Sequence, residues 1–150
     1  MINARKTFAN YLYDLVTVDV QNALPQDYPE LNFVCEDWET ITYPVVILKF
    51  LSSNFYSSPF KEMAVGIDVI FNNRETEKCE KTTAALLKIL KLDTNYHNEA
   101  RMIDIYNYDT NPASLLSGKI FWQSLENVVI HVDAEPEIRK RSFTLKLIII

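Results

Sequence analysis

The side chains best suited to chemistry in this chain are two histidines and two cysteines. Neither His97 nor His131 has a Cys, His, Asp or Glu at a spacing typical of metal ligands. Cys35 and Cys79 lie far apart in the sequence, which fits neither a disulfide framework nor a zinc knuckle. Both cysteines sit among apolar residues, so we expect two free thiols in a reducing compartment rather than a nucleophile.

An acidic cluster and a shortage of glycine narrow the chemistry further. Glu36, Asp37 and Glu39 could hold calcium, but they lack the glycine and the spaced oxygens of a calcium loop, so a solvated acidic loop is favoured. The chain has two glycines, Gly66 and Gly118, so no phosphate-cradling loop can be written. No nucleophile elbow occurs either. The sequence therefore predicts no catalysis, no cofactor and no metal, although an enzyme that lacks short motifs stays open.

Length and charge set the class of protein. The chain has 150 residues, of which 48% are hydrophobic and 23% charged, and this predicts a single domain over residues 1–150. The net charge is −5, and the excess of acids lies in the first half of the chain. This lowers the expectation of nucleic-acid binding, because such proteins usually carry a basic excess. We expect neither a secretory signal nor a membrane span, and hence a cytosolic protein.

Hydrophobic periodicity predicts the elements that position these residues. Amphipathic helices are expected over 4–24 and 75–92. Strands are expected over 31–35, 43–51, 61–71 and 100–106, a loop over 107–118, and two hairpin arms over 119–132 and 138–150. This order predicts an α+β fold: a mainly antiparallel β-sheet with two principal helices packed on one face and a long C-terminal β-hairpin.

Three features indicate contacts with other proteins. The loop over 52–60 places Phe55, Tyr56 and Phe60 among small polar residues, which is typical of a binding surface, although folding back onto the core is nearly as well supported. The apolar end of the chain, residues 147–150, predicts either a buried strand, which is favoured, or a strand that pairs with a neighbour.

The third feature is the distribution of charge. The acidic loop of Glu36, Asp37 and Glu39 and the basic run of Arg139 and Arg141 could meet between neighbouring subunits. Contacts between unlike surfaces of one chain generate rings. A solvated strand end remains the alternative for the basic run.

The order of elements resembles that of the tail terminator and tail-completion proteins, the head–tail neck proteins of long-tailed bacteriophages. The closing stretch carries most of the likeness: the strand that begins at Gly118, the turn over 133–136 and the alternating residues 143–147. The likeness covers most of the chain as an order of elements rather than as a specific motif.

The resemblance implies a structural virion protein that is made and assembled in the host cytoplasm. It implies a ring, typically hexameric, that caps the tail tube and joins it to the head. The partners would be further copies of the chain, the tail tube protein and the head-completion proteins, with DNA passing through the lumen without sequence readout and no membrane. A baseplate, neck or tube-associated adaptor without catalysis is the alternative.

Overall fold

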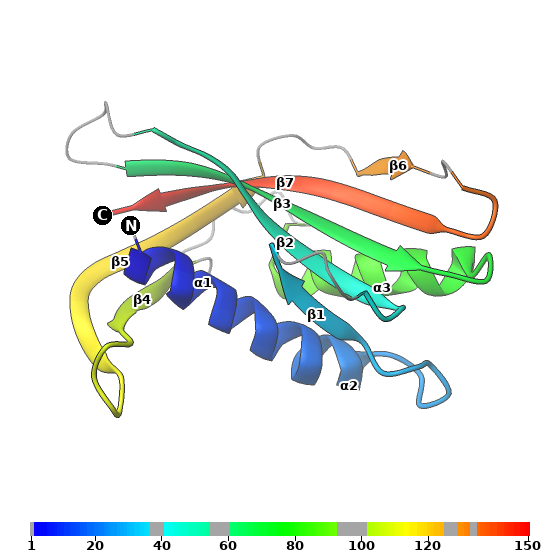
Figure 1. Cartoon of the computed structure of the whole chain (residues 1–150), viewed down its shortest axis with the longest axis horizontal. Helices are drawn as coiled ribbons and strands as arrows, with labels where there is room; N and C mark the ends of the chain where they lie inside the picture. The colour runs from blue at the N-terminus through cyan, green and yellow to red at the C-terminus, as the bar shows by residue number, and fades with distance from the viewer. Residues whose placement is uncertain (1, 37–40, 55–60, 93–101, 125–128, 133–134) are drawn as a thin grey trace.

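The computed structural model describes residues 2–36, 41–54, 61–92, 102–124, 129–132 and 135–150. The protein has an α+β fold with a mixed, curled sheet and two helices (Figure 1). The helical segments are α1 (Ile2–Asp14), the π-helical η1 (Leu15–Val20), α2 (Gln21–Ala23) and α3 (Thr76–Ile89). The strands are β1 (Asn32–Cys35), β2 (Val45–Asn54), β3 (Lys61–Phe71), β4 (Met102–Asn107), β5 (Ser114–Ser124), β6 (Ile130–Val132) and β7 (Arg139–Ile149).

The first predicted helix is present as α1, η1 and α2. The residues that join these segments keep helical backbone angles, so the three run on as one helix. Phe8, Leu12, Val16 and Val20 recur every four residues along it and are fully buried, as its amphipathic pattern predicts. Leu24 is already extended, immediately before Pro25, which ends the helix because proline disfavours a helical conformation in the residue before it.

The strand order is β1-β2-β3-β7-β5-β4, and β6 pairs with β7 beside this path. Among the strand pairs that the structure describes, β1–β2 is parallel and the others are antiparallel. The sheet is therefore mixed, because β1 runs alongside β2 in the same direction. Periodicity predicts a strand over 31–35 but not the direction in which it pairs.

The predicted hairpin of β2 and β3 is confirmed by an antiparallel register that runs from Val45↔Ile70 to Asn54↔Glu62, with one shift between Phe50 and Ser52. Along β3, Val65, Ile67 and Val69 point into the main core, while Asp68 points to the opposite face. The alternation of side chains in a strand produces this division.

Strand β7 lies inside the sheet. It pairs with β3 along one side, and with β6 and then β5 along the other. Leu147 is fully buried and the strand runs to Ile149, so the prediction of a buried terminal strand is confirmed in part, while Ile150 is 54% exposed. Neither side of this apolar strand is a free sheet edge.

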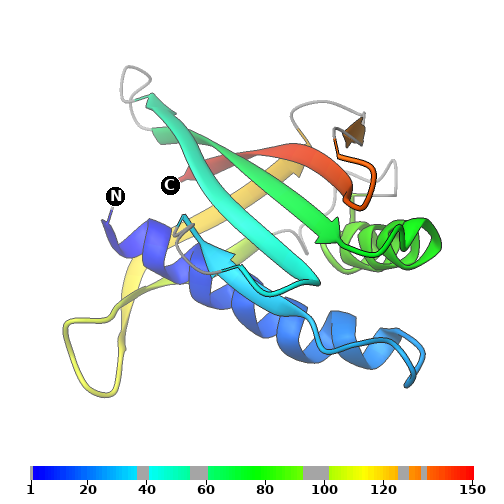
Figure 2. The same ribbon diagram turned by 45° about the vertical axis from the view of Figure 1, so that its right-hand side comes forward.

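The predicted loop over 107–118 is wrong in its second half, because β5 already begins at Ser114 and pairs with β4. The register shifts between Asp104↔Lys119 and Tyr106↔Leu115, so three residues of β5 lie opposite one of β4. Such a bulge bends a strand pair. Beyond this bulge, residues 106–117 project from the rest of the molecule (Figure 2). We call these residues the arm.

Gly118 sits in this bulge, where a side chain has no room. A Cβ atom there would lie 2.9 Å from Ile105 Cδ1 and 3.0 Å from the backbone oxygen of Ile150. We expect Gly118→Ala to lower the free energy of unfolding by about 1–3 kcal/mol, because the Ile105 side chain and the Ile150 backbone oxygen, which accepts the Lys119 N–H at 3.1 Å, must both shift. Thermal unfolding followed by circular dichroism measures this.

Gly66→Ala is the matched control for this substitution. Its Cβ would meet nothing closer than the flexible Leu51 side chain, at 3.5 Å. The control should change stability by less than about 1 kcal/mol. Equal losses in the two variants would contradict the assignment of a packing role to Gly118.

The helices and the sheet share a hydrophobic core. Its buried residues come from α1 and η1, from α3, and from one face of β2, β3 and β7, with Ile105, Ile120 and Trp122 from β4 and β5. A smaller cluster of Val45, Ile47 and Ile70 lies on the other face of β2 and β3. The first helix thus bridges distant parts of the sheet, since α1 contacts β4 and η1 contacts both β1 and α3.

Candidate protein interface

Most of the residues predicted to contact other proteins lie outside the described part of the chain. These are Phe55, Tyr56 and Phe60 of the aromatic loop, and Asp37 and Glu39 of the acidic loop. Their assignment to an interface stays a prediction. The flanking β2 and β3 are described, so the aromatic loop joins the ends of this hairpin.

Glu36 is the described member of the acidic loop. It is exposed, follows β1 directly and has a positive backbone φ of 61°, a conformation that non-glycine residues adopt at some cost. Its Oε1 accepts a hydrogen bond of 2.9 Å from the Phe50 backbone N–H, which fixes the side chain over the neighbouring strand.

Arg139 and Arg141 both point toward α3. Arg139 Nε donates to Thr76 Oγ1 at 2.9 Å, and Arg141 Nη2 lies 3.2 Å from Glu80 Oε1. The Arg141 side chain is only 3% exposed, so its charge is used within the chain. The two arginines therefore connect β7 to α3, and a subunit contact through Arg139 and Glu36 stays a prediction.

Sequence reasoning missed a group of exposed apolar side chains on the arm. Tyr106 is 37% exposed, Leu115 62% and Leu116 37%. Tyr106 and Leu115 are register partners, and the Tyr108 ring lies 6.4 Å from that of Tyr106, so all three share one side of the arm. One sequence feature could have indicated these exposed side chains: a pair of leucines between two serines, in a segment with one charged residue, Asp109.

A groove of about 450 Å³ separates the base of the arm from α1. Its aromatic walls are Tyr11, Tyr106 and Tyr108, and Asp104 is paired with Lys119 at its rim. Burial, and to a lesser extent the Asp19 carboxylate, raises the pKa of the Tyr11 phenol, so Tyr11 stays protonated at neutral pH. The described lining also includes Thr7, Asn10 and Asp14, so polar and aromatic side chains share the groove.

A second groove, of about 230 Å³, lies between α1 and β1. We call it the Arg5 groove; it is lined by Arg5, Lys6, Ala9, Cys35, Glu36 and Phe50. The Arg5 guanidinium lies 5.3 Å from the centre of the Phe50 ring, a cation–π contact. In the part of the chain that the structure describes, Arg5 Nε is buried and has no hydrogen-bond partner.

Cys35 lines this groove as a partly exposed, free thiol. Burial, and secondarily the Glu36 carboxylate, raises its pKa. We expect its alkylation rate to rise only at a higher pH than that of a free thiol, because the thiolate is the reactive form. Glu36→Gln should shift this profile back part of the way, while its amide oxygen can still accept the Phe50 N–H. Mass-resolved alkylation over a pH series measures both, and an unchanged profile in Glu36→Gln would exclude the carboxylate as a cause.

No protein-family model matches this sequence, and a comparison with curated proteins finds no match. Within the described ranges, no group of three His, Cys, Asp or Glu side chains is placed to bind a metal ion. In the same ranges, no helix has both the length and the apolar character needed to cross a membrane.

Proposed function

We propose that this chain is a structural virion protein, a tail terminator that forms a ring, typically hexameric, on the end of the phage tail tube and joins it to the head. It acts by assembly, with no catalytic step and no cofactor. Its partners are further copies of itself, the tail tube protein and the head-completion proteins, and DNA passes through the lumen. In the cell it is made and assembled in the host cytoplasm.

The observation that carries this proposal is the arm. Its exposed apolar side chains, Tyr106, Leu115 and Leu116, lie on a strand pair that projects from a domain with a well-packed core. A projecting segment with clustered apolar side chains is typical of a surface that another protein covers. The order of elements, which resembles that of tail terminators, supplies the kind of assembly.

The finer architecture is also part of the proposal. We take α1 and α3 to form one layer against the concave side of a mainly antiparallel sheet, with a C-terminal hairpin of β5 and β6 against β7. The shared core of α1, η1, α3, β3 and β7 supports this arrangement. In a ring, the arm would then remain for contacts between subunits.

Mass photometry with negative-stain imaging, on the chain alone and on added tail tubes, tests the function. We expect closed rings with a central hole, either free or on tube ends. A chain that stays monomeric and leaves tube ends bare would overturn the terminator assignment. Capture of a non-identical neck or baseplate protein in a fixed ratio, without rings, would identify the adaptor alternative.

A further inference from the structure

We propose that the arm of one copy docks in the Arg5 groove of the next copy, so that this contact joins the subunits. The inference rests on the proposed assembly function, because it requires copies of the chain to meet. It adds to that function the two surfaces that touch. Neither surface needs the residues that lie outside the described part of the chain.

The arm offers apolar side chains and one negative charge. Leu115 and Leu116 are exposed, and Asp109 is the single charged residue between positions 105 and 118. Asn107 Oδ1 accepts a hydrogen bond of 3.0 Å from the Asp109 N–H, which orders this turn. No cation in the described part of the chain pairs with the Asp109 carboxylate.

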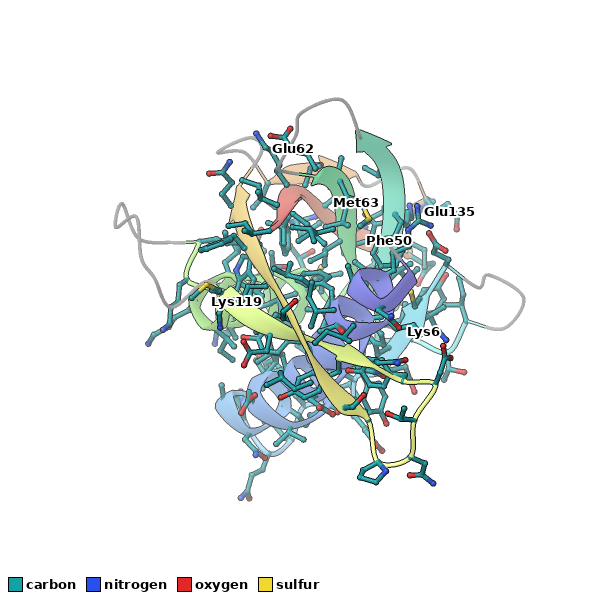
Figure 3. All side chains as sticks on the ribbon, turned by 90° about the vertical axis from the view of Figure 1, so that its left-hand side faces the viewer. Lys6, Phe50, Glu62, Met63, Lys119 and Glu135 are labelled. Carbon is teal, nitrogen blue, oxygen red and sulfur yellow. The ribbon has the colours of Figure 1, made fainter. Side chains whose placement is uncertain are left out.

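The Arg5 groove has the complementary features, an apolar surface and an excess of positive charge. Ala9 and Phe50 give it apolar walls, and the two cations Arg5 and Lys6 outnumber the single carboxylate of Glu36. That carboxylate already accepts the Phe50 N–H. Neither Arg5 nor Lys6 forms an ion pair with another described residue. Figure 3 shows Lys6 on α1 and Phe50 on the same side of the molecule.

Apolar surface and opposite charge therefore match between the two sites. Docking would bury Leu115 and Leu116 and bring the Asp109 carboxylate to Arg5 and Lys6, where opposite charges select the partner and its orientation. The Thr7 hydroxyl, which accepts the Tyr106 N–H at 3.1 Å, fixes the base of the arm to α1 and so reduces the ordering needed on binding. Because arm and groove are unlike surfaces, the contact propagates from copy to copy, and it forms a ring when the rotation between copies closes.

The native Cys35 in the groove allows a direct test. Ser117→Cys places a thiol beside the arm leucines with little change in size. After mild oxidation, we expect disulfide-linked species on a non-reducing gel that extend beyond the dimer. They should disappear when Cys35→Ser is added. The second native thiol, Cys79, is fully buried and should not take part.

Ala84→Cys is the matched control, because Ala84 is an exposed small residue on α3, away from the arm. It should give no ladder that depends on Cys35. A Ser117→Cys chain without Cys35-dependent linkage at the highest soluble concentration would overturn the inference. A ladder that stops at the dimer would overturn the head-to-tail arrangement.

Charge exchange gives an independent measurement. Asp109→Arg and Lys6→Glu should each weaken assembly by about tenfold, because each puts like charges together. The double variant should recover most of this loss, and absence of recovery would contradict the pairing. Both residues are exposed, so circular dichroism should show folded chains.

The outcomes distinguish this contact from the proposed function. If rings form without Cys35-dependent linkage, this contact is wrong and the proposed function stands. If no rings form on tubes either, the proposed function itself fails.

Discussion

Replacing Trp122 with alanine should lower the free energy of unfolding by about 3–5 kcal/mol, the range for deletion of a large buried aromatic side chain. Trp122 on β5 is 3% exposed, and its ring centre lies 6.2 Å from that of Phe8 and 5.3 Å from that of Tyr11, both on α1. Its Nε1 donates to the backbone oxygen of Leu90, at the end of α3, at 3.0 Å. One side chain thus joins both helices to the sheet.

Urea unfolding followed by far-ultraviolet circular dichroism measures this loss as a lower midpoint. Trp122→Phe is the control, because it keeps an aromatic ring and removes only the N–H donor. We expect it to cost about 1–2 kcal/mol, since the Leu90 carbonyl loses its buried donor. A loss below about 1 kcal/mol in Trp122→Ala would show that the site can collapse around the missing ring.

Replacing Asp68 with alanine should cost about 2–3 kcal/mol. Asp68 lies on the face of β3 opposite the main core, and its side chain is 7% exposed. Its Oδ2 lies 2.7 Å from Lys49 Nζ and 3.6 Å from Lys140 Nζ, and its Oδ1 accepts a hydrogen bond of 2.6 Å from Ser142 Oγ. Removing the carboxylate leaves two cations facing each other. Their partial exposure to water keeps the cost below that of a fully buried pair.

Glu62→Ala is the matched control for Asp68, because Glu62 also pairs across the β3–β7 register. Glu62 Oε1 lies 3.3 Å from Lys146 Nζ, and both side chains are about a third exposed, at 35% and 29%. Such pairs contribute little, so the expected loss is below about 1 kcal/mol. The same urea experiment compares the two variants. Equal losses would contradict the view that burial makes the Asp68 cluster important.

Local sequence patterns were sufficient to predict the helices and strands whose partners lie close in sequence or whose hydrophobic periodicity is strong. The first helix was predictable because its apolar residues recur every three or four positions. The β2–β3 hairpin and β7 were predictable because buried and exposed positions alternate along them. In β7 the alternation also placed Arg139 and Arg141 on the same face as Phe143, and their contacts with α3 agree with this.

The arm was not predicted from the sequence because its hydrophobic pattern is weak and because the sequence does not show which strand it pairs with. Ser114 to Gly118 shows neither alternation nor β-branched residues, and its strand character comes from pairing with β4 and from the bulge next to that pairing. The sequence also did not predict that β1 pairs in parallel, since the direction of pairing depends on which strand lies next to it in the fold. The burial of Arg141 could not be foreseen because it depends on Glu80, which the fold brings from a distant helix.

The sequence by itself determined the α+β class and most of the helix and strand positions, and it contained none of the motifs from which a catalytic or metal site could be predicted. These follow from composition and from periodicities of two and of 3.6 residues, which depend only on neighbouring residues. The tertiary structure alone decided which strands pair, which charges are used inside the chain, and that Leu115, Leu116 and Asp109 are presented on an arm while Arg5 and Lys6 line a groove. Exposure and charge pairing depend on residues far apart in the sequence, so only the folded chain fixes them.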